Sequence, residues 1–210
     1  MNSALAADAS TLRANGKSGW HQRAFEFLVR HRIRISVIVF VCLILEDLLE
    51  RRQPRDLANF RDPWMMLGLA LVSGGLALRS WAAGTLKKWA QLTTQGPYGV
   101  IRHPLYVGSF MMMIGFCVLI NDEKNIYFIL GPVLLMYLAK VFKEERLLAG
   151  KFGAPWQAYA AAVPRFIPRR LPRTPFAAWS LQQWLGSREY RALVSGLLGL
   201  VAVQLWRLAA

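Results

Sequence analysis

The amino-acid sequence predicts an all-α membrane protein, a polytopic bundle of about five transmembrane helices with a polar pocket on its cytoplasmic side. Two observations predict this fold class. The 210 residues are 55% hydrophobic, yet the chain has a formal net charge of +14. Long apolar runs also recur along the chain, and a helical run of about 20 apolar residues crosses a bilayer. Basic loops between apolar helices account for both properties, which a soluble protein of this size rarely combines.

We expect the five transmembrane helices at about residues 33–50, 64–84, 104–120, 126–149 and 191–207. The second run follows Pro63, and Trp64 and Trp81 lie near its two ends, as is typical of tryptophan at membrane–water interfaces. Pro104 suits the start of the third, because proline in a first helical turn loses no hydrogen bond. We expect the fourth to end at Gly150, since glycine commonly follows a helix C-terminus.

These helices divide the chain into four segments. We expect residues 1–32 to be a basic, partly disordered N-terminus, and they lack the apolar run of a signal peptide. Residues 33–84 hold the first two helices, residues 85–170 a core with the helical hairpin 104–149, and residues 171–210 a basic connector and the fifth helix. The sequence has no Gly-rich loop after a strand, which excludes a Rossmann-type nucleotide site.

The charge distribution predicts the orientation in the membrane. With the N-terminus in the cytoplasm, about 20 of the 26 Lys and Arg residues fall on the cytoplasmic side, and such an excess is typical of cytoplasmic loops. This topology places residues 85–103 and 143–190 on the same face of the membrane. Two polar segments that are far apart in the sequence can therefore meet there.

Residues 96–106 are a polar island between two apolar runs. They contain a Gly-Pro turn, two tyrosines, an arginine and one of only three histidines. If Pro104 opens a helix, His103 occupies its N-cap, where backbone N–H groups favour anions. The stretch is therefore a candidate site for a small anionic ligand.

Simpler interpretations of the same residues stay open at this point. Arg102 can extend to lipid phosphates, and His103 can be a plain N-cap. Tyr98 and Tyr106 can belong to an interfacial aromatic belt.

Glu144 and Glu145 continue the fourth helix where it leaves the bilayer. Lys140 lies one turn before Glu144, so the two can form an ion pair on one helix face. The alternative is a pair of carboxylates at the mouth of a membrane cavity, on the same side as Arg102 and His103.

The segment Arg102-His103-Pro104-Leu105-Tyr106-Val107-Gly108 resembles the Arg-His-Pro-x-Tyr-x-Gly motif of the isoprenylcysteine carboxyl methyltransferase and phospholipid methyltransferase superfamily. Further residues match the family in order and spacing: Glu144, Glu145, Phe152, Gly153, Trp156, Tyr159, Val163, Pro164 and Arg165. The resemblance covers about residues 85–168, and its motifs are separated by a helical hairpin. It implies that residues 85–170 are a methyltransferase core with a cytoplasmic cofactor pocket.

The resemblance implies S-adenosylmethionine as cofactor and assigns residues to it. Family members contact the cofactor through the segment before the Gly-x-Tyr turn, that Tyr, the His-Pro-x-Tyr run and a Glu. Together with Arg102, whose cation can hold the methionyl carboxylate, the expected cofactor-binding set is Leu92, Thr93, Tyr98, Arg102, His103, Pro104, Leu105, Tyr106 and Glu144. The candidate catalytic residues are Lys140, Glu145 and Arg165. Lys140 stands where some members have Arg; it keeps the charge but lacks the bidentate fork.

The leading hypothesis is thus an integral membrane methyltransferase that acts on a lipid or lipid-like acceptor, such as an isoprenylcysteine. In a bacterium its expected location is the inner membrane. Its expected partners are a lipophilic substrate and the bilayer, without nucleic acid. Neither cysteine belongs to a metal-ligand spacing, so no metal site is predicted. One alternative is an intramembrane NADPH-dependent reductase of a sterol-like lipid. The other is a non-catalytic protein whose basic face binds anionic lipids.

Overall fold

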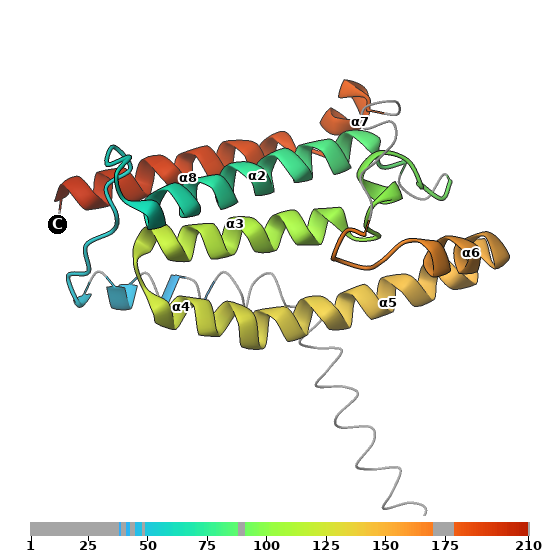
Figure 1. Ribbon diagram of the computed structural model, residues 1–210, viewed down its shortest axis with the longest axis horizontal. Coiled ribbons are helices and arrows are strands. Elements are labelled where there is room, and N and C mark those ends of the chain that lie inside the picture. The colour runs from blue at the N-terminus through green and yellow to red at the C-terminus, as the bar shows by residue number, and fades with distance from the viewer. Residues whose placement is uncertain are drawn as a thin grey trace, which may run out of the picture.

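The chain is all-helical over the residues that the computed structural model describes, which are 38, 41–42, 45–47, 49–87, 91–169 and 179–209, with only the backbone of Glu123. Its elements are α2 (Pro63–Thr85), η1 (Gly96–Gly99), α3 (Pro104–Ile120), α4 (Glu123–Phe128), η2 (Ile129–Val133), α5 (Leu134–Phe152), α6 (Ala154–Ala162), α7 (Leu181–Gly186) and α8 (Tyr190–Ala209) (Figure 1). No strand occurs in these described ranges, which confirms the all-α prediction.

Within the described residues, three helices are long and apolar enough to cross a membrane: α2, the continuous helix Lys124–Phe152 and α8. The helix α3 is also apolar but has only 17 residues. These four correspond to the predicted second to fifth spans. Most of the predicted first helix at 33–50 lies outside the described residues, as do the predicted basic N-terminus (residues 1–32) and residues 171–178 of the connector.

The helix ends follow from local sequence chemistry. Asp62 caps α2, because its carboxylate accepts a hydrogen bond from the Trp64 N–H at 2.9 Å. The helix α5 passes through Gly150 and ends at Phe152, so the predicted end at Gly150 is wrong. The residue that follows α5 is Gly153, whose φ of 57° is a backbone conformation that favours glycine.

The helices α2 and α3 pack closely because glycines face each other along their contact. A Cβ atom added to Gly75 would lie 2.6 Å from the carbonyl oxygen of Gly108. One added to Gly115 would lie 2.8 Å from the carbonyl oxygen of Gly68. Next to this contact lies the buried apolar core, formed by Met65, Val72, Leu76, Leu119, Ile120 and Val203.

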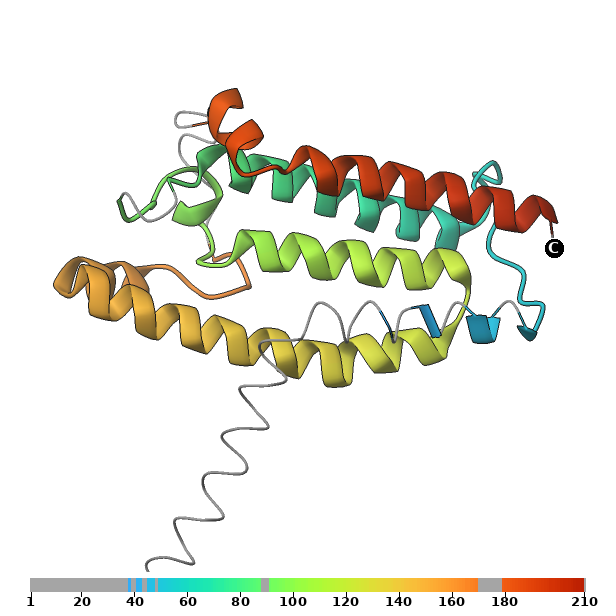
Figure 2. The same cartoon turned by 180° about the vertical axis from the view of Figure 1, so that it is seen from behind.

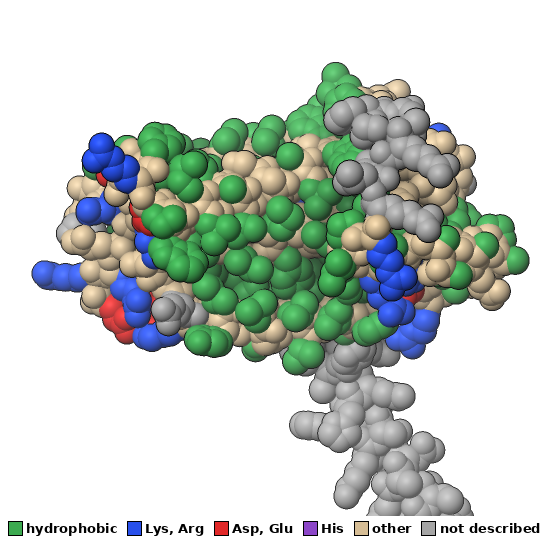
Figure 3. All heavy atoms as spheres, in the orientation of Figure 1, with side chains coloured by type: hydrophobic (Ala, Val, Ile, Leu, Met, Phe, Trp, Pro, Cys, Tyr) green, Lys and Arg blue, Asp and Glu red, His purple; other side chains and the backbone are tan. Residues whose placement is uncertain are grey.

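The long helices lie side by side, and the short elements η1, α6 and α7 gather at one end of the bundle. Figures 1 and 2 show η1, α6 and α7 at the end where α2 stops and α3 starts, with the C-terminus at the opposite end. Arg79 of α2 binds Glu189, the residue before α8, through two hydrogen bonds of 2.7 and 3.0 Å. On the face shown in Figure 3, hydrophobic side chains cover the middle, and Lys and Arg lie towards both ends. This distribution suits a protein that spans a bilayer.

The close α2–α3 contact leads to a prediction on stability. We expect Gly75→Ala to destabilise the protein by about 1–3 kcal/mol, because the added methyl group collides with backbone. Gly150→Ala is the control, since no atom lies within 4 Å of an added Cβ there. Thermal unfolding in detergent, followed by tryptophan fluorescence, measures both. Equal melting temperatures for the two variants would contradict the packing described.

Candidate functional site

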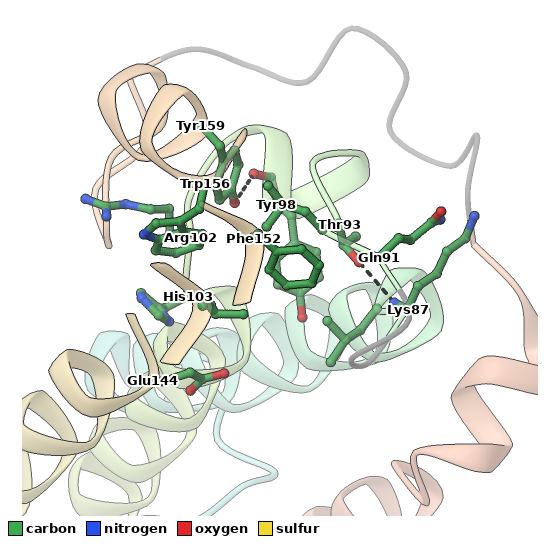
Figure 4. Close-up of a pocket in the computed structure, with 13 residues that line it drawn as sticks. Lys87, Gln91, Thr93, Tyr98, Arg102, His103, Glu144, Phe152, Trp156 and Tyr159 are labelled. Atoms are coloured by element: carbon green, nitrogen blue, oxygen red, sulfur yellow. Dashed lines mark hydrogen bonds between the residues drawn. The ribbon is translucent and has the colours of Figure 1, made fainter. Parts of the chain in front are cut away.

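A cavity of about 100 Å³ lies at the end of the bundle where α3 begins. Its walls are formed by three parts of the chain: the segment between α2 and α3, the second half of α5, and the helix α6 (Figure 4). Its lining residues are Leu86, Lys87, Gln91, Leu92, Thr93, Tyr98, Arg102, His103, Glu144, Leu148, Phe152, Trp156 and Tyr159. A more polar cavity of about 200 Å³ shares Lys87, Gln91, Leu92 and Thr93 with it. The site therefore has an aromatic side and a polar side.

Tyr98 lies in the cavity wall, and its buried hydroxyl has no hydrogen-bond partner among the described residues. The turn at η1, where Gly96 has a φ of 57°, positions this residue. The Tyr159 hydroxyl also donates to the Tyr98 carbonyl at 2.7 Å. Burial raises the pKa of the Tyr98 phenol, so the hydroxyl keeps its proton. An unpaired buried hydroxyl is costly, and a polar ligand in the cavity would satisfy it.

His103 occupies the N-cap of α3, but its side chain makes no capping hydrogen bond. Its Nε2 lies 3.2 Å from Glu145 Oε1 instead. Because an ionised carboxylate can only accept, Nε2 carries the proton in this contact. Burial lowers the pKa of His103, although the hydrogen bond to Glu145 acts in the opposite direction. The side chain is therefore a neutral hydrogen-bonding group of the cavity wall and not a plain N-cap.

Glu145 is 9% exposed and binds three nitrogen-bearing side chains. Its Oε1 lies 2.9 Å from Arg102 Nη1, and Arg165 forms a fork with hydrogen bonds of 3.0 and 3.1 Å to its Oε2. In Figure 4 the guanidinium of Arg102 points away from the other labelled side chains. The cation expected to hold a ligand carboxylate is thus already paired with Glu145.

Glu144 lines the cavity, in contrast to its neighbour. Its Oε2 accepts a hydrogen bond of 2.9 Å from the Tyr106 hydroxyl. The possible pair with Lys140 does not form among the described residues, because no ion pair joins those two side chains. The carboxylate therefore faces the interior of the protein.

A separate apolar groove of about 310 Å³ lies on the other side of Tyr106. Its lining residues are Leu71, Tyr106, Val107, Phe110, Met111, Ile114, Leu134, Tyr137, Leu138, Val141 and Phe166. The Tyr106 ring packs edge-on against Tyr137, with ring centroids 5.6 Å apart. Since the Tyr106 hydroxyl reaches Glu144, this one side chain connects the apolar groove with the polar cavity.

The structure brings together most of the residues predicted to bind a cofactor. Those that line the cavity are Leu92, Thr93, Tyr98, Arg102, His103 and Glu144. Tyr106 lines the groove, whereas Pro104 and Leu105 only start α3. The candidate catalytic residues Lys140, Glu145 and Arg165 line neither the cavity nor the groove.

Sequence reasoning missed Lys87 and Gln91, which line both the cavity and its polar neighbour. Their closeness to Leu92 and Thr93 is the only signal in the sequence. The aromatic residues Phe152, Trp156 and Tyr159 belong to the family motif, but nothing in their spacing assigned them to a cavity wall.

Comparison with known proteins gives a family match and several relatives. Residues 63–155 match the family model described as phospholipid methyltransferase. The nickel-cobalt-cadmium resistance protein NccN of Alcaligenes xylosoxydans xylosoxydans is 32% identical over 153 residues, which are 68% of this chain and 67% of that protein. The cobalt-zinc-cadmium resistance protein CzcN of Cupriavidus metallidurans is 30% identical over 162 residues, 76% of this chain and 74% of that protein.

Two further comparisons bear on the activity. Protein-S-isoprenylcysteine O-methyltransferase of Schizosaccharomyces pombe is 28% identical over 99 residues, 47% of this chain and 42% of that protein. The 7-dehydrocholesterol reductase of Xenopus laevis is 29% identical over 86 residues, 39% of this chain but only 18% of that reductase. No solved structure matches the chain.

The buried imidazole predicts a pH dependence of stability. The pKa of His103 is lowered in the folded protein, and that of an unfolded histidine is about 6.5. Below that pH the imidazole is protonated in the unfolded chain but stays neutral in the folded chain, so the free energy of unfolding should decrease as the pH is lowered. Each unit of pKa difference between the two states is worth about 1.4 kcal/mol. We expect a steeper fall of melting temperature between about pH 7.5 and 5.5 for the wild type than for His103→Gln. Parallel curves would contradict the burial of a neutral imidazole.

Proposed function

The chain belongs to the superfamily of integral membrane methyltransferases that includes the phospholipid and isoprenylcysteine enzymes. We propose that it transfers a methyl group from S-adenosylmethionine to a lipid or lipid-like acceptor. One observation carries the proposal. A cavity with both aromatic and polar walls and an apolar groove meet at the Tyr106–Glu144 hydrogen bond of 2.9 Å. A water-soluble donor and a lipophilic acceptor need two such compartments side by side.

The chemistry of the cavity suits S-adenosylmethionine. The Tyr98 hydroxyl, which is unpaired within the part of the chain that the structure describes, is a buried donor that a polar ligand atom can satisfy. The rings of Tyr98, Phe152 and Trp156 can stack on an adenine base and stabilise a cation over their faces. The Glu144 carboxylate can accept hydrogen bonds from ribose hydroxyls. With Arg102 paired to Glu145, Lys87 is the cation that we assign to the methionyl carboxylate.

The apolar groove would hold the acceptor. Its lining is almost entirely hydrocarbon and aromatic, so burial of a lipid chain there is favourable by about 25 cal/mol per Å². S-adenosylmethionine supplies a methyl group on a sulfonium, which an in-line displacement converts to a neutral thioether. For an ionised oxygen acceptor the protein then needs only to align the acceptor and exclude water, which are strong contributions to such a transfer. An amine acceptor also has to lose a proton to solvent before it attacks the methyl group.

The proposed orientation keeps the N-terminus in the cytoplasm. The excess of Lys and Arg on that side supports it. The cavity then opens to the cytoplasm, from which a soluble cofactor can enter, while the acceptor approaches from the bilayer between the helices.

Two other functions have to be compared with methyl transfer. The names of two relatives refer to metal resistance, and the reductase among the relatives suggests the reduction of a sterol-like lipid. Among the described residues, no group of three or more His, Cys, Asp or Glu side chains could hold a metal ion, and metal binding is not part of the proposal. The reductase comparison covers less than a fifth of that protein, whereas the phospholipid methyltransferase model covers residues 63–155. A non-catalytic role that depends on the basic surface would not explain why the cavity and the groove adjoin each other.

Ligand-dependent stabilisation tests the cofactor. We expect S-adenosylmethionine or S-adenosylhomocysteine at about 100 times its dissociation constant to stabilise the detergent-purified protein by about 2.7 kcal/mol, with no effect of NADPH. Glu144→Gln should weaken this shift, whereas Glu50→Gln, an exposed carboxylate outside the cavity, should not. Stabilisation by NADPH alone would defeat the proposal in favour of the reductase. No shift with any ligand would favour a non-catalytic protein.

Filling the groove tests the acceptor site. We expect Leu138→Trp to raise the KM for the acceptor at least about tenfold, because the larger side chain overfills the groove, and to leave the dissociation constant of S-adenosylhomocysteine unchanged. Leu135→Trp is the matched control, since Leu135 is 67% exposed on the same helix. The measurement is transfer of a labelled methyl group to phosphatidylethanolamine, to an S-prenylated cysteine and to lipids of the native membrane. Equal effects of both variants would exclude the groove.

A further inference from the structure

We propose that Glu145 is a positioning residue whose buried carboxylate holds Arg102, His103 and Arg165 together, and so fixes a cover segment (residues 163–169) against the start of α3. This inference rests on the proposed function, since it explains how the wall between the cofactor cavity and the acceptor groove is kept in place. It assigns to Glu145 and Arg165 a role that does not include contact with either substrate.

The contacts of Glu145 all lie within the protein. Its Oε1 accepts from Arg102 Nη1 at 2.9 Å, from His103 Nε2 at 3.2 Å and from Arg165 Nε at 3.1 Å. Its Oε2 accepts from Arg165 at 3.0 and 3.1 Å. Both oxygens are thus saturated with donors, and Glu145 lines neither the cavity nor the groove. A carboxylate in this setting is a poor proton acceptor for a substrate.

Backbone hydrogen bonds tie the same two segments together. The Arg102 N–H donates to the Pro164 carbonyl at 2.8 Å, and the His103 N–H donates to the Arg165 carbonyl at 3.2 Å. The residues that precede α3 therefore pair with the cover segment through backbone as well as side chains. These two amide protons report directly on whether the cover segment is in place.

The cover segment separates the two compartments. Phe166 lines the apolar groove and lies against His103, with ring centroids 6.0 Å apart, while His103 lines the polar cavity. The guanidinium of Arg165 lies over the Phe142 ring at 5.2 Å. Loss of the Glu145 carboxylate would remove the side-chain contacts that hold both the cover segment and the start of α3 against α5. It would also leave the guanidinium charges of Arg102 and Arg165 without their counter-ion.

The test uses Glu145→Gln, Arg165→Gln and Arg165→Lys in the full-length protein, with Arg169→Gln as the control, because Arg169 is exposed in the same segment. Hydrogen–deuterium exchange of the peptide that contains Arg102 and His103 is measured together with the dissociation constant of S-adenosylhomocysteine, at a temperature where each variant is folded. We expect Glu145→Gln and Arg165→Gln to increase exchange at these amides and to weaken binding at least about tenfold. Arg165→Lys, which keeps the charge and loses the fork, should be intermediate, and Arg169→Gln should match the wild type.

The outcomes separate the possibilities. Wild-type exchange in Glu145→Gln and Arg165→Gln would overturn the inference. So would a loss of turnover with unchanged exchange and unchanged binding, which is the signature of a catalytic carboxylate. If Glu145→Gln does not fold, the two Arg165 variants carry the same test. If the wild type binds no S-adenosylhomocysteine, the proposed function fails, and the exchange measurement alone still decides whether Glu145 holds the cover segment.

Discussion

A single buried carboxylate, Glu145, is the constraint on which the geometry of the site depends. Removing a charge from water is costly unless partners replace its hydration, and here Arg102, His103 and Arg165 provide them. These partners come from the start of α3 and from the chain after α6. Pairing the charge of Glu145 therefore requires both segments to lie close to the second half of α5. The helix α6 leads into the second of these segments, and its aromatic residues Trp156 and Tyr159 lie in the cavity wall.

The second constraint is the close contact of α2 with α3. Their facing glycines, Gly75 and Gly108, allow backbone approach that any side chain would prevent. On the other side of α3, Tyr137 of α5 packs edge-on against Tyr106 and Phe110, and the groove lies beside this contact. A rigid α2–α3 pair and a clamped end of α5 together determine where the groove meets the cavity, at Tyr106.

The sequence predicted the four long apolar helices that the structure describes, and it named residues that the structure brings to one cavity, but it did not provide the internal geometry of that cavity. The start of α3 and the gathering of Tyr98, His103 and Glu144 at one cavity followed from an apolar run, a helix-opening proline and a motif. The end of α5 was misplaced because Gly150 and Gly153 are both plausible stops, and only the backbone φ distinguishes them. Lys87 could not be identified, since its position depends on the tertiary fold of the chain that leaves α2.

The adjacent carboxylates Glu144 and Glu145 explain why the remaining site could not be derived from sequence. Consecutive residues of a helix point about 100° apart, so one pair of identical side chains faces two environments. Glu145 faces the guanidinium groups of Arg102 and Arg165, which together with His103 saturate its oxygens. Glu144 faces the cavity, where the Tyr106 hydroxyl is its hydrogen-bond donor, and retains capacity to accept from a ligand. Their roles therefore differ because of what packs against each face of α5, which residue type and spacing alone do not encode.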